Sequence, residues 1–281
     1  MARYKKIFSK IRDQFNIIVE KPLLTSAIVL AIIALLVLSF SFKYYLNDFE
    51  NFWPQILAEA HGMIFDIAII GILLVWLNQN GETRQRIRFY RDEIDDFRLW
   101  ESDEAAFRTV GNIKRLNRNK IHDINLVNCY LSRTNLNYVN LAGSNMNSAN
   151  FSNSSLIETN LENTRLNQTN FENSNLNQAF LKGAYASGAN FKDAFLIKSQ
   201  FQGAFLIKTN FKNAFLMEAN LSGSYLMGAD FENASLYKAD LRGAKGLTLE
   251  QLTKAKTLYL AKFDDELLEE VKTIIPELVG A

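Results

Sequence analysis

The clearest pattern of hydrophobic positions along the chain has a period of five residues. Every fifth residue from Leu126 to Leu241, 24 positions in all, is Leu or Phe, apart from Met146 and Ala186. From Cys129 to Ala239 the residue two positions before the large one is Ala, Ser, Thr or Cys, apart from Val139, and the residue directly before the large one is most often Asn or Asp. A period of five fits neither an amphipathic helix nor an alternating strand. The pattern therefore predicts a solenoid over residues 121–245.

Residue types also recur at a spacing of 20, which is four units of the pattern. If four units close one coil, residues 20 apart stack on one another, and each file of stacked residues should keep one residue type. Six coils spaced about 4.8 Å apart would make a rod of about 29 Å. The files predicted to stack are Phe151, Phe171, Phe191, Phe211 and Phe231; Leu156, Leu176, Leu196, Leu216 and Leu236; and, on the outside, Asn150, Asn170, Asn190 and Asn210.

Units such as residues 189–193 (ANFKD) and 229–233 (ADFEN) carry the motif in full. They resemble the pentapeptide-repeat family, and the resemblance covers Ile124 to Ala244. It implies an all-β, right-handed quadrilateral β-helix, in which the large central residue and the small residue two before it point inward. Proline is absent from this stretch, as expected where each strand must donate to a ladder of hydrogen bonds.

Two apolar stretches precede the repeat and predict a membrane α-helical hairpin at residues 22–80. Pro22 to Phe42 is uncharged over 21 positions, which is long enough to cross a bilayer as a helix and too long for the apolar part of a signal peptide. The second stretch runs from Ile56 to Leu77, with Pro54 expected in the first turn of its helix. A short outer loop joins the two predicted spans.

Basic residues predict the orientation of this hairpin. Six lie in residues 1–21, four follow the second apolar stretch, and the loop carries only Lys43. Because positive charge is retained on the cytoplasmic side, we expect both termini and the repeat domain in the cytoplasm, with residues 1–21 as a cytoplasmic N-terminal segment. The expected location is the inner (cytoplasmic) membrane, as a multi-pass protein with the lipid bilayer as one partner.

Glu59 and Asp66 form a candidate intramembrane polar site. They are seven residues apart in the second predicted span, so a helix places both carboxyl groups on one stripe. Ionisable groups at membrane depth are costly and face protein or water. Either these groups lie near the outer interface or against another helix, or several copies of the chain line an ion path with them.

Residues 81–120 are predicted to form an amphipathic connector helix and N-terminal cap. Its apolar positions Ile87, Tyr90, Ile94 and Phe97 follow helical spacing, and Gly111 is expected to break it. The apolar stripe could pack on the first coil of the solenoid or pair with another copy of the chain.

Residues 246–281 are predicted to form a C-terminal helical cap over the exposed strand edge of the last coil. Thr248 and Gln251 form a capping box for a helix that continues to about Lys256. Asp264 or Asp265 can begin a second helix that ends before Pro276.

The candidate partner or self-association surface lies on the outside of the rod, because an interior filled by Leu and Phe has no room for a ligand. Outward positions are mostly polar, but between residues 185 and 227 alternate units carry large apolar residues. Stacked aromatic residues could simply cover one another, or they could mark protein contact and homo-oligomer formation. Since ten residues are half a coil, two opposed apolar faces are predicted: Phe195, Ile197, Phe215 and Met217 on one, and Tyr185, Phe205, Ile207, Tyr225 and Met227 on the other.

Composition and charge argue against several other classes of function. The formal net charge is +1, and residues 121–244 carry nine basic and nine acidic residues, so no nucleic-acid partner or DNA mimicry is expected. One cysteine, Cys129, and two histidines are too few for a disulfide or the usual zinc sites. The repeat contains no Gly-rich phosphate loop, and we expect no enzyme activity, catalytic residue, metal or cofactor.

The sequence thus predicts a membrane-anchored, non-enzymatic scaffold that mediates protein–protein interaction or self-assembly at the cytoplasmic face, with an unknown protein partner. The alternative is an oligomeric membrane effector or channel. In that case the second span lines an ion path, and the repeat domain senses a partner or drives oligomerisation.

Overall fold

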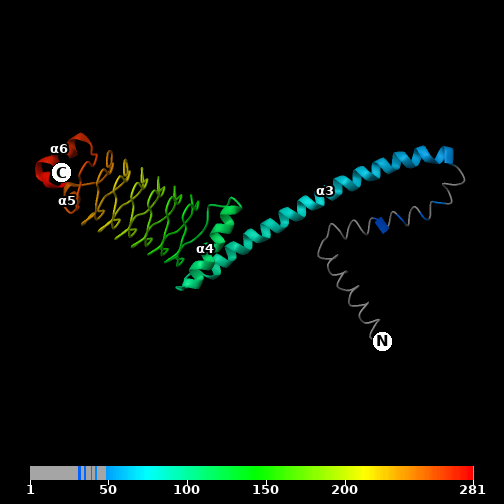
Figure 1. Cartoon of the computed structure of the whole chain (residues 1–281), viewed down its shortest axis with the longest axis horizontal. Coiled ribbons are helices and arrows are strands. Elements are labelled where there is room, and N and C mark those ends of the chain that lie inside the picture. Colours follow the sequence, from blue (N-terminus) through cyan, green and yellow to red (C-terminus); the bar gives the residue numbers. More distant parts are fainter. Residues whose placement is uncertain (1–30, 33–34, 36–38, 40–41, 43–48, 281) are drawn as a thin grey trace, which may run out of the picture. The chain divides into compact units, whose positions relative to one another are not determined.

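The computed structural model describes residues 31–32, 35, 39, 42 and 49–280 of the chain (Figure 1). The chain divides into two compact units, Met1–Arg84 and Gln85–Ala281. The predicted N-terminal segment, the loop around Lys43 and most of the first predicted span lie outside the described residues. The five described positions of that span are helical.

The first long element of the described chain is helix α3, which spans Phe49–Asp96 (Figure 1). Its predicted start at Pro54 is wrong, because the helix begins five residues earlier and contains this proline. A proline beyond the first turn removes one hydrogen bond, a cost that a helix of 48 residues can carry. By length and composition, Gly62–Asp96 could cross a membrane, and it is the one such helix among the described residues.

Helix α3 also passes the predicted boundary at residue 80 without a break. The predicted second span and the first part of the predicted connector are therefore one helix. The sequence around this boundary contains Gly81 but no proline. A single glycine costs a helix only about 1 kcal/mol, so nothing local stops it.

The break that was predicted at Gly111 lies instead before Ser102. The backbone of Leu99 has φ 68°, in the left-handed region, and ends the helical path. Ser102 then caps helix α4, Asp103–Arg118, by accepting a hydrogen bond from the backbone N–H three residues later. Gly111 stays helical because this cap and the buried face of α4 outweigh the small cost of a glycine.

The apolar stripe of the predicted connector contacts the repeat core. Ile94 is buried, and Ile87 and Tyr90 pack against the same hydrophobic cluster. The side-chain amide of Asn112 in α4 donates to Glu93 Oε2 at 2.9 Å, which joins α4 to the end of α3. Of the two arrangements considered for this stripe, the structure therefore has the one in which it packs within its own chain.

The first coil of the solenoid is also held by an arginine from this region. The Arg98 guanidinium donates to the backbone carbonyls of Asn125 and Val127. These carbonyls lie at the open edge of the first coil, where no preceding coil can donate to them. Arg98 therefore satisfies part of a strand edge that would otherwise be exposed.

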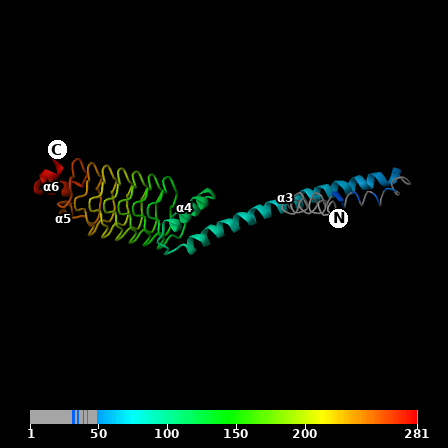
Figure 2. The ribbon, with the colours of Figure 1, turned by 60° about the horizontal axis from the view of Figure 1, so that its bottom comes forward.

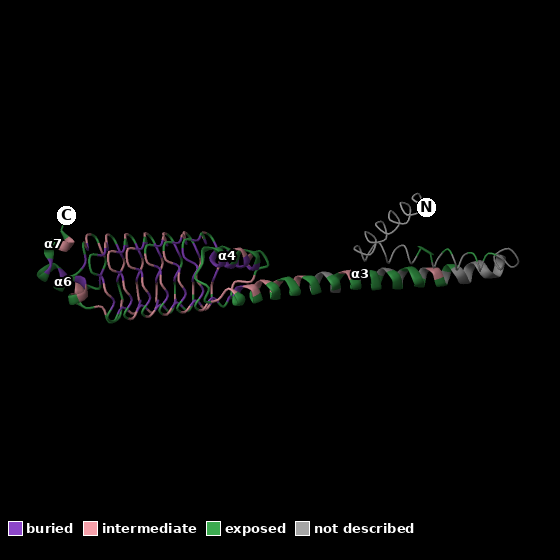
Figure 3. Cartoon of the chain, turned by 90° about the horizontal axis from the view of Figure 1, so that it is seen from below, coloured by how far each residue is buried: buried purple, intermediate pink, exposed green. Residues whose placement is uncertain are grey.

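Residues 124–245 form stacked coils (Figure 2). Parallel bridges join residues 20 apart, from Asn125 with Asn145 to Tyr225 with Lys245. The large central residues are buried throughout, and Figure 3 shows buried positions recurring along every coil. The turn in each unit requires a positive φ, for example 57° at Asn153, a conformation that Asn and Gly adopt readily.

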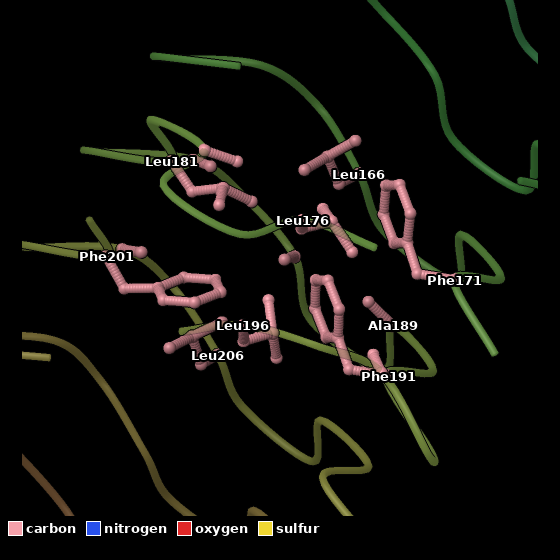
Figure 4. Packing of buried hydrophobic residues seen from close by; sticks show 14 of the residues in the cluster. Leu166, Phe171, Leu176, Leu181, Ala189, Phe191, Leu196, Phe201 and Leu206 are labelled. Atoms are coloured by element: carbon pink, nitrogen blue, oxygen red, sulfur yellow. The ribbon is translucent and has the colours of Figure 1, made fainter. Parts of the chain in front are cut away.

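The predicted stacking of the five phenylalanines is confirmed. From Phe151 to Phe231 the centroids of successive rings are 5.2, 4.9, 5.3 and 5.4 Å apart, and the rings are nearly parallel. Figure 4 shows Phe171 and Phe191 pointing the same way from successive coils, beside Leu176 and Leu196. All five residues of the leucine file are fully buried. The coil length read from the sequence is therefore the coil length of the fold.

Three of the four residues in the predicted outer asparagine file are joined along the rod axis by side-chain hydrogen bonds, and Asn150 is not part of this ladder. Asn190 Nδ2 donates to Asn170 Oδ1, and Asn210 Nδ2 donates to Asn190 Oδ1, both at 3.0 Å. The same oxygens also accept from backbone N–H groups two residues on, that of Glu172 for Asn170 and that of Lys192 for Asn190. Each amide therefore supports both its own turn and the next coil.

The coil geometry continues beyond the predicted boundary at residue 245. Ser235 bridges Thr257 and Asp240 bridges Lys262, a spacing of 22 residues instead of 20. The inward Leu258 is fully buried, like the leucines of the preceding coils. The last, partial coil therefore has the backbone pairing of the repeat without its sequence pattern.

Helix α5, Leu249–Leu252, accounts for the two additional residues. The predicted capping box between Thr248 and Gln251 is present. Gln251 Nε2 also donates to the carbonyls of Leu226 and Ala229, at 2.8 Å each. This one side chain thus joins the short helix to the preceding coil.

Helix α5 ends before the predicted Lys256, because the chain that follows returns to the ladder. The backbone N–H of Lys256 donates to the carbonyl of Ala234 at 2.9 Å, so it is not available to a longer helix. Helix α6, Asp265–Ile274, and helix α7, Pro276–Val279, complete the described chain. The predicted helix start near Asp264 and its end before Pro276 agree with these bounds.

Candidate interaction surface

The first apolar face, called here the Tyr185 face, consists of Tyr185, Phe205, Ile207, Tyr225 and Met227. The three aromatic rings stack at centroid distances of 4.8 and 4.6 Å and are within 4° of parallel. Tyr185 and Met227 are exposed, and the other three are half-buried. The structure therefore brings together all five residues predicted for this face.

Cationic residues lie at both ends of this stack. Arg165 pairs with Tyr185 in the ladder, and Lys245 pairs with Tyr225. Lys245 Nζ lies 4.7 Å from the Tyr225 ring centroid and donates to its hydroxyl at 3.1 Å. The ammonium group covers the last ring by a cation–π contact, so the apolar part of the face is limited to the coils between these two cations.

The second apolar face, called here the Phe195 face, consists of Phe195, Ile197, Phe215 and Met217. The two phenyl rings stack at 4.9 Å and 5°. Because residue 195 is half a coil from residue 205, this face lies on the side of the coil opposite the Tyr185 face. The predicted arrangement of two opposed stacks is therefore present.

Two tyrosines that the sequence analysis missed extend the Phe195 face. Tyr237 follows Met217 at the 20-residue spacing, and Tyr259 stacks on Tyr237 at 5.9 Å. Tyr259 was missed because it lies in the last coil, where the spacing is 22 and the sequence repeat has ended. Tyr237 could have been found by continuing the outward file by one more coil.

Both interpretations of the stacks draw support from these distances. Parallel rings less than 5 Å apart cover one another's faces and stabilise neighbouring coils. However, the outer edges remain accessible, since Tyr185 is 46%, Phe195 41% and Phe215 37% exposed. Internal stacking therefore covers part of the apolar area and leaves the rest exposed.

The candidate polar site, Glu59 and Asp66, lies in helix α3. Glu59 and Asp66 are both exposed, and neither forms an ion pair with any described residue. Their seven-residue spacing in one continuous helix keeps them on one stripe.

Titratable groups of the rod offer little chemistry. Burial raises the pKa of the Cys129 thiol to about 11, against a smaller opposite effect of Arg98. The Arg242 guanidinium, hydrogen-bonded to Asp240 at 3.0 and 2.6 Å, holds the pKa of that carboxyl below its usual range. Within the described residues, no three His, Cys, Asp or Glu side chains are grouped to hold a metal ion.

A family model described as pentapeptide repeats (8 copies) matches this chain in five overlapping segments, at residues 124–163, 154–193, 164–203, 196–233 and 214–245. Residues 124–245 are pentapeptide repeats. In general, proteins with this domain are structural or interaction proteins and not enzymes. The pentapeptide-repeat domain has four units in each coil and points its Leu and Phe residues inward, as expected from the resemblance to this family.

Several solved pentapeptide-repeat structures are similar to the chain. A protein of the Arabidopsis thaliana thylakoid lumen is 27% identical over 38% of this chain and 67% of its own, with a TM-score of 0.25. Rfr23 from the cyanobacterium Cyanothece is 22% identical over 55% of this chain and 95% of its own, with a TM-score of 0.32. QnrB1, a plasmid-mediated fluoroquinolone resistance protein, is 16% identical over 57% and 88%, with a TM-score of 0.28. None of the curated proteins compared with the chain matches it.

Proposed function

We propose that this protein is a membrane-anchored, non-enzymatic scaffold whose pentapeptide-repeat domain assembles proteins at the cytoplasmic face of the membrane. The observation that carries the proposal is the pair of opposed, partly exposed aromatic stacks on the Tyr185 face and the Phe195 face. Contiguous exposed apolar patches on folded proteins commonly mark contact with another protein.

The positions of the two faces favour side-by-side assembly. One apolar patch on a protein allows a closed dimer, whereas two patches on opposite sides allow each copy to contact two neighbours. The large apolar residues of both faces begin at residue 185, and the coils before it present mainly Asn and Ser at the equivalent ladder positions. The contact surface is therefore confined to the C-terminal half of the rod.

The membrane part of the proposal rests on the apolar stretch of α3 and on the distribution of basic residues. The helix is long and apolar enough to cross a bilayer. Four arginines follow the apolar stretch, between residues 84 and 91, and this placement favours a cytoplasmic repeat domain.

Light scattering on the full-length protein in detergent tests the assembly. Phe205→Glu disrupts the Tyr185 face and Phe215→Glu disrupts the Phe195 face, and the double variant should reduce the particle to a folded monomer. If each face pairs with its own kind, either single variant should leave a dimer. If the two faces pair with each other, either single variant should already give monomers. An oligomer of unchanged mass in the double variant would contradict the proposal.

An oligomeric membrane effector or channel is the second candidate. It is favoured by Glu59 and Asp66, two carboxyl groups on one stripe of an otherwise apolar segment with no ion-pair partner among the described residues. Conductance in reconstituted bilayers that is abolished in Glu59→Ala and Asp66→Ala would support it. Electrically silent bilayers with the wild-type protein would exclude it.

A further inference from the structure

A groove of about 400 Å³ lies on the outside of the rod and is lined by residues between Glu158 and Gln202. Its walls come from three successive coils, and neither apolar face includes it. We call it the Phe180 groove. With a stacking repeat of 20 residues, its main lining residues form three files along the rod: Glu158 and Lys198; Phe180 and Gln200; Glu162, Lys182 and Gln202.

Phe180 is an exposed aromatic residue without an aromatic neighbour. Its ladder partners are Asn160 and Gln200, and its ring stacks on no other ring in the described part of the chain. Phe195, by comparison, has a nearly equal exposure, 41% against 42%, but stacks on Phe215. The ring of Phe180 is therefore available to an occupant of the groove.

Three of the four charged residues of the groove likewise have no ion-pair partner. Glu158, Glu162 and Lys182 form no ion pair with any described residue. Glu162 and Lys182 occupy the same positions in their units as Glu172 and Lys192, which pair at 3.0 Å on the opposite side of the rod. The groove thus keeps apart two opposite charges that the same register brings together elsewhere.

A chain of amides forms one wall. Gln200 Nε2 donates to the Lys198 carbonyl, and Gln202 Nε2 donates to Gln200 Oε1, both at 2.8 Å. Gln202 Oε1, at the end of this chain, accepts no hydrogen bond and is shielded from solvent. An N–H group in the groove would satisfy this oxygen once the Gln202 amide turns toward it.

The spacing of the charges selects a conformation for the occupant. The two carboxylates lie two coils from Lys198, a distance of about 9.6 Å along the rod at the usual strand spacing. A polyproline II helix advances about 9.3 Å in three residues and returns to the same side, whereas residues three apart in a β-strand point to opposite sides. Lys198 lies 3.8 Å from Glu218, an exposed ion pair that a carboxylate of the occupant can replace at little cost.

We propose that the Phe180 groove binds a polyproline II segment of a partner protein in which a basic and an acidic residue are three positions apart with prolines between them. The basic side chain pairs with Glu158 and Glu162, and the acidic one with Lys198 and Lys182. The proline rings pack on Phe180. A polyproline II segment has no internal hydrogen bonds, so its backbone is free to pair with the amide wall. The site does not depend on assembly through either apolar face.

Fluorescence polarisation with the full-length protein in detergent tests this inference. The probe is a fluorescein-labelled peptide with blocked ends that contains Arg-Pro-Pro-Asp between glycines. The control peptides contain Arg-Pro-Pro-Arg or Asp-Pro-Pro-Asp. We expect saturable binding of the mixed-charge peptide and at least about tenfold weaker binding of both controls. The second arginine of one control would lie against the lysines of the groove, and the first aspartate of the other would lie against its glutamates. A reversed peptide is no control, since a polyproline II segment can lie in either direction.

Two sets of variants locate the binding site. Phe180→Ala should raise the Kd about tenfold, whereas Phe195→Ala, which removes an equally exposed ring from another side, should leave it unchanged. Glu158→Lys combined with Glu162→Lys should transfer the preference to the Asp-Pro-Pro-Asp peptide. Circular dichroism checks that each variant is folded. Absence of saturable binding, equal losses in the two phenylalanine variants, or an unchanged preference after the charge reversal would each overturn the inference.

Discussion

Replacing Phe191 by alanine tests whether the stacked phenylalanine file holds the rod together. Phe191 is fully buried and touches three aromatic rings. Its centroid lies 4.9 Å from Phe171 and 5.3 Å from Phe211 in stacked geometry, and 5.8 Å from Phe201 in edge-to-face geometry. Phe151 is also fully buried but contacts one ring, that of Phe171 at 5.2 Å. The two positions therefore differ in aromatic contacts but not in exposure.

The structure provides an expected difference between the two variants. A buried Phe→Ala substitution costs about 3 to 5 kcal/mol through lost transfer energy and the remaining cavity. Each aromatic pair adds about 0.5 to 1.5 kcal/mol. Phe191 has two more such pairs than Phe151, so we expect Phe191→Ala to cost about 1 to 3 kcal/mol more than Phe151→Ala. In absolute terms the costs should be near 5 and 3 kcal/mol, the two ends of the usual range.

Urea unfolding of the full-length protein in detergent, followed by far-UV circular dichroism, measures both free energies of unfolding. Phe195→Ala serves as the control, because its ring is 41% exposed and has one stacked neighbour. It should cost clearly less than either buried variant. If Phe191→Ala and Phe151→Ala cost the same within about 0.5 kcal/mol, pairwise ring contacts do not set the stability of the file and the reasoning fails.

Three further predictions concern single side chains. Arg242→Met removes the main group that lowers the pKa of Asp240 in the folded protein. A lowered carboxyl pKa stabilises the fold at pH values above the unfolded pKa, and this stabilisation is lost as the pH falls through the folded pKa. The difference in the free energy of unfolding between wild type and variant should therefore be largest at pH 7 and should narrow below about pH 4 in urea titrations. A gap that stays constant over this range would contradict the assignment. Cys129, buried and with a pKa of about 11, should resist alkylation by iodoacetamide at pH 8 until denaturant is added; rapid labelling of the native protein, read by mass spectrometry, would show that the first coil opens. Gln251→Ala removes the capping box and two hydrogen bonds to the preceding coil, and should lower stability by about 2 kcal/mol in the same assay, whereas Glu250→Ala on the exposed side of the same helix should have almost no effect.

The repeat domain is the part of the chain that sequence alone predicts best. In a solenoid a fixed sequence spacing becomes a fixed spatial neighbour, so residue 171 must lie on residue 151 wherever the coil length is 20. The same rule placed Phe205 between Tyr185 and Tyr225 and put Phe195 on the opposite side of the rod. No long-range contact had to be guessed, because each one is a multiple of the period.

The ends of the rod could not be predicted in this way. There the periodicity stops, and alternatives that differ by about 1 kcal/mol in local propensity are decided by packing. Gly111 stays helical because α4 buries a face against the core, and the helix breaks before Ser102, where a cap is available. Helix α5 ends early because backbone groups near Lys254 pair with the last coil. Helix α3 begins before Pro54, with no signal in the apolar pattern.

The interaction surfaces were likewise predictable from the sequence only in part. Periodicity alone determined which outward residues share a face, and thus both aromatic stacks. Only the tertiary structure showed that Tyr259 joins the Phe195 face after a coil of 22 residues, that Glu162 and Lys182 stay apart, and that a groove opens beside Phe180. The physical reason is that backbone register follows from the repeat, whereas the pairing of long polar side chains depends on the competing partners within reach of each one.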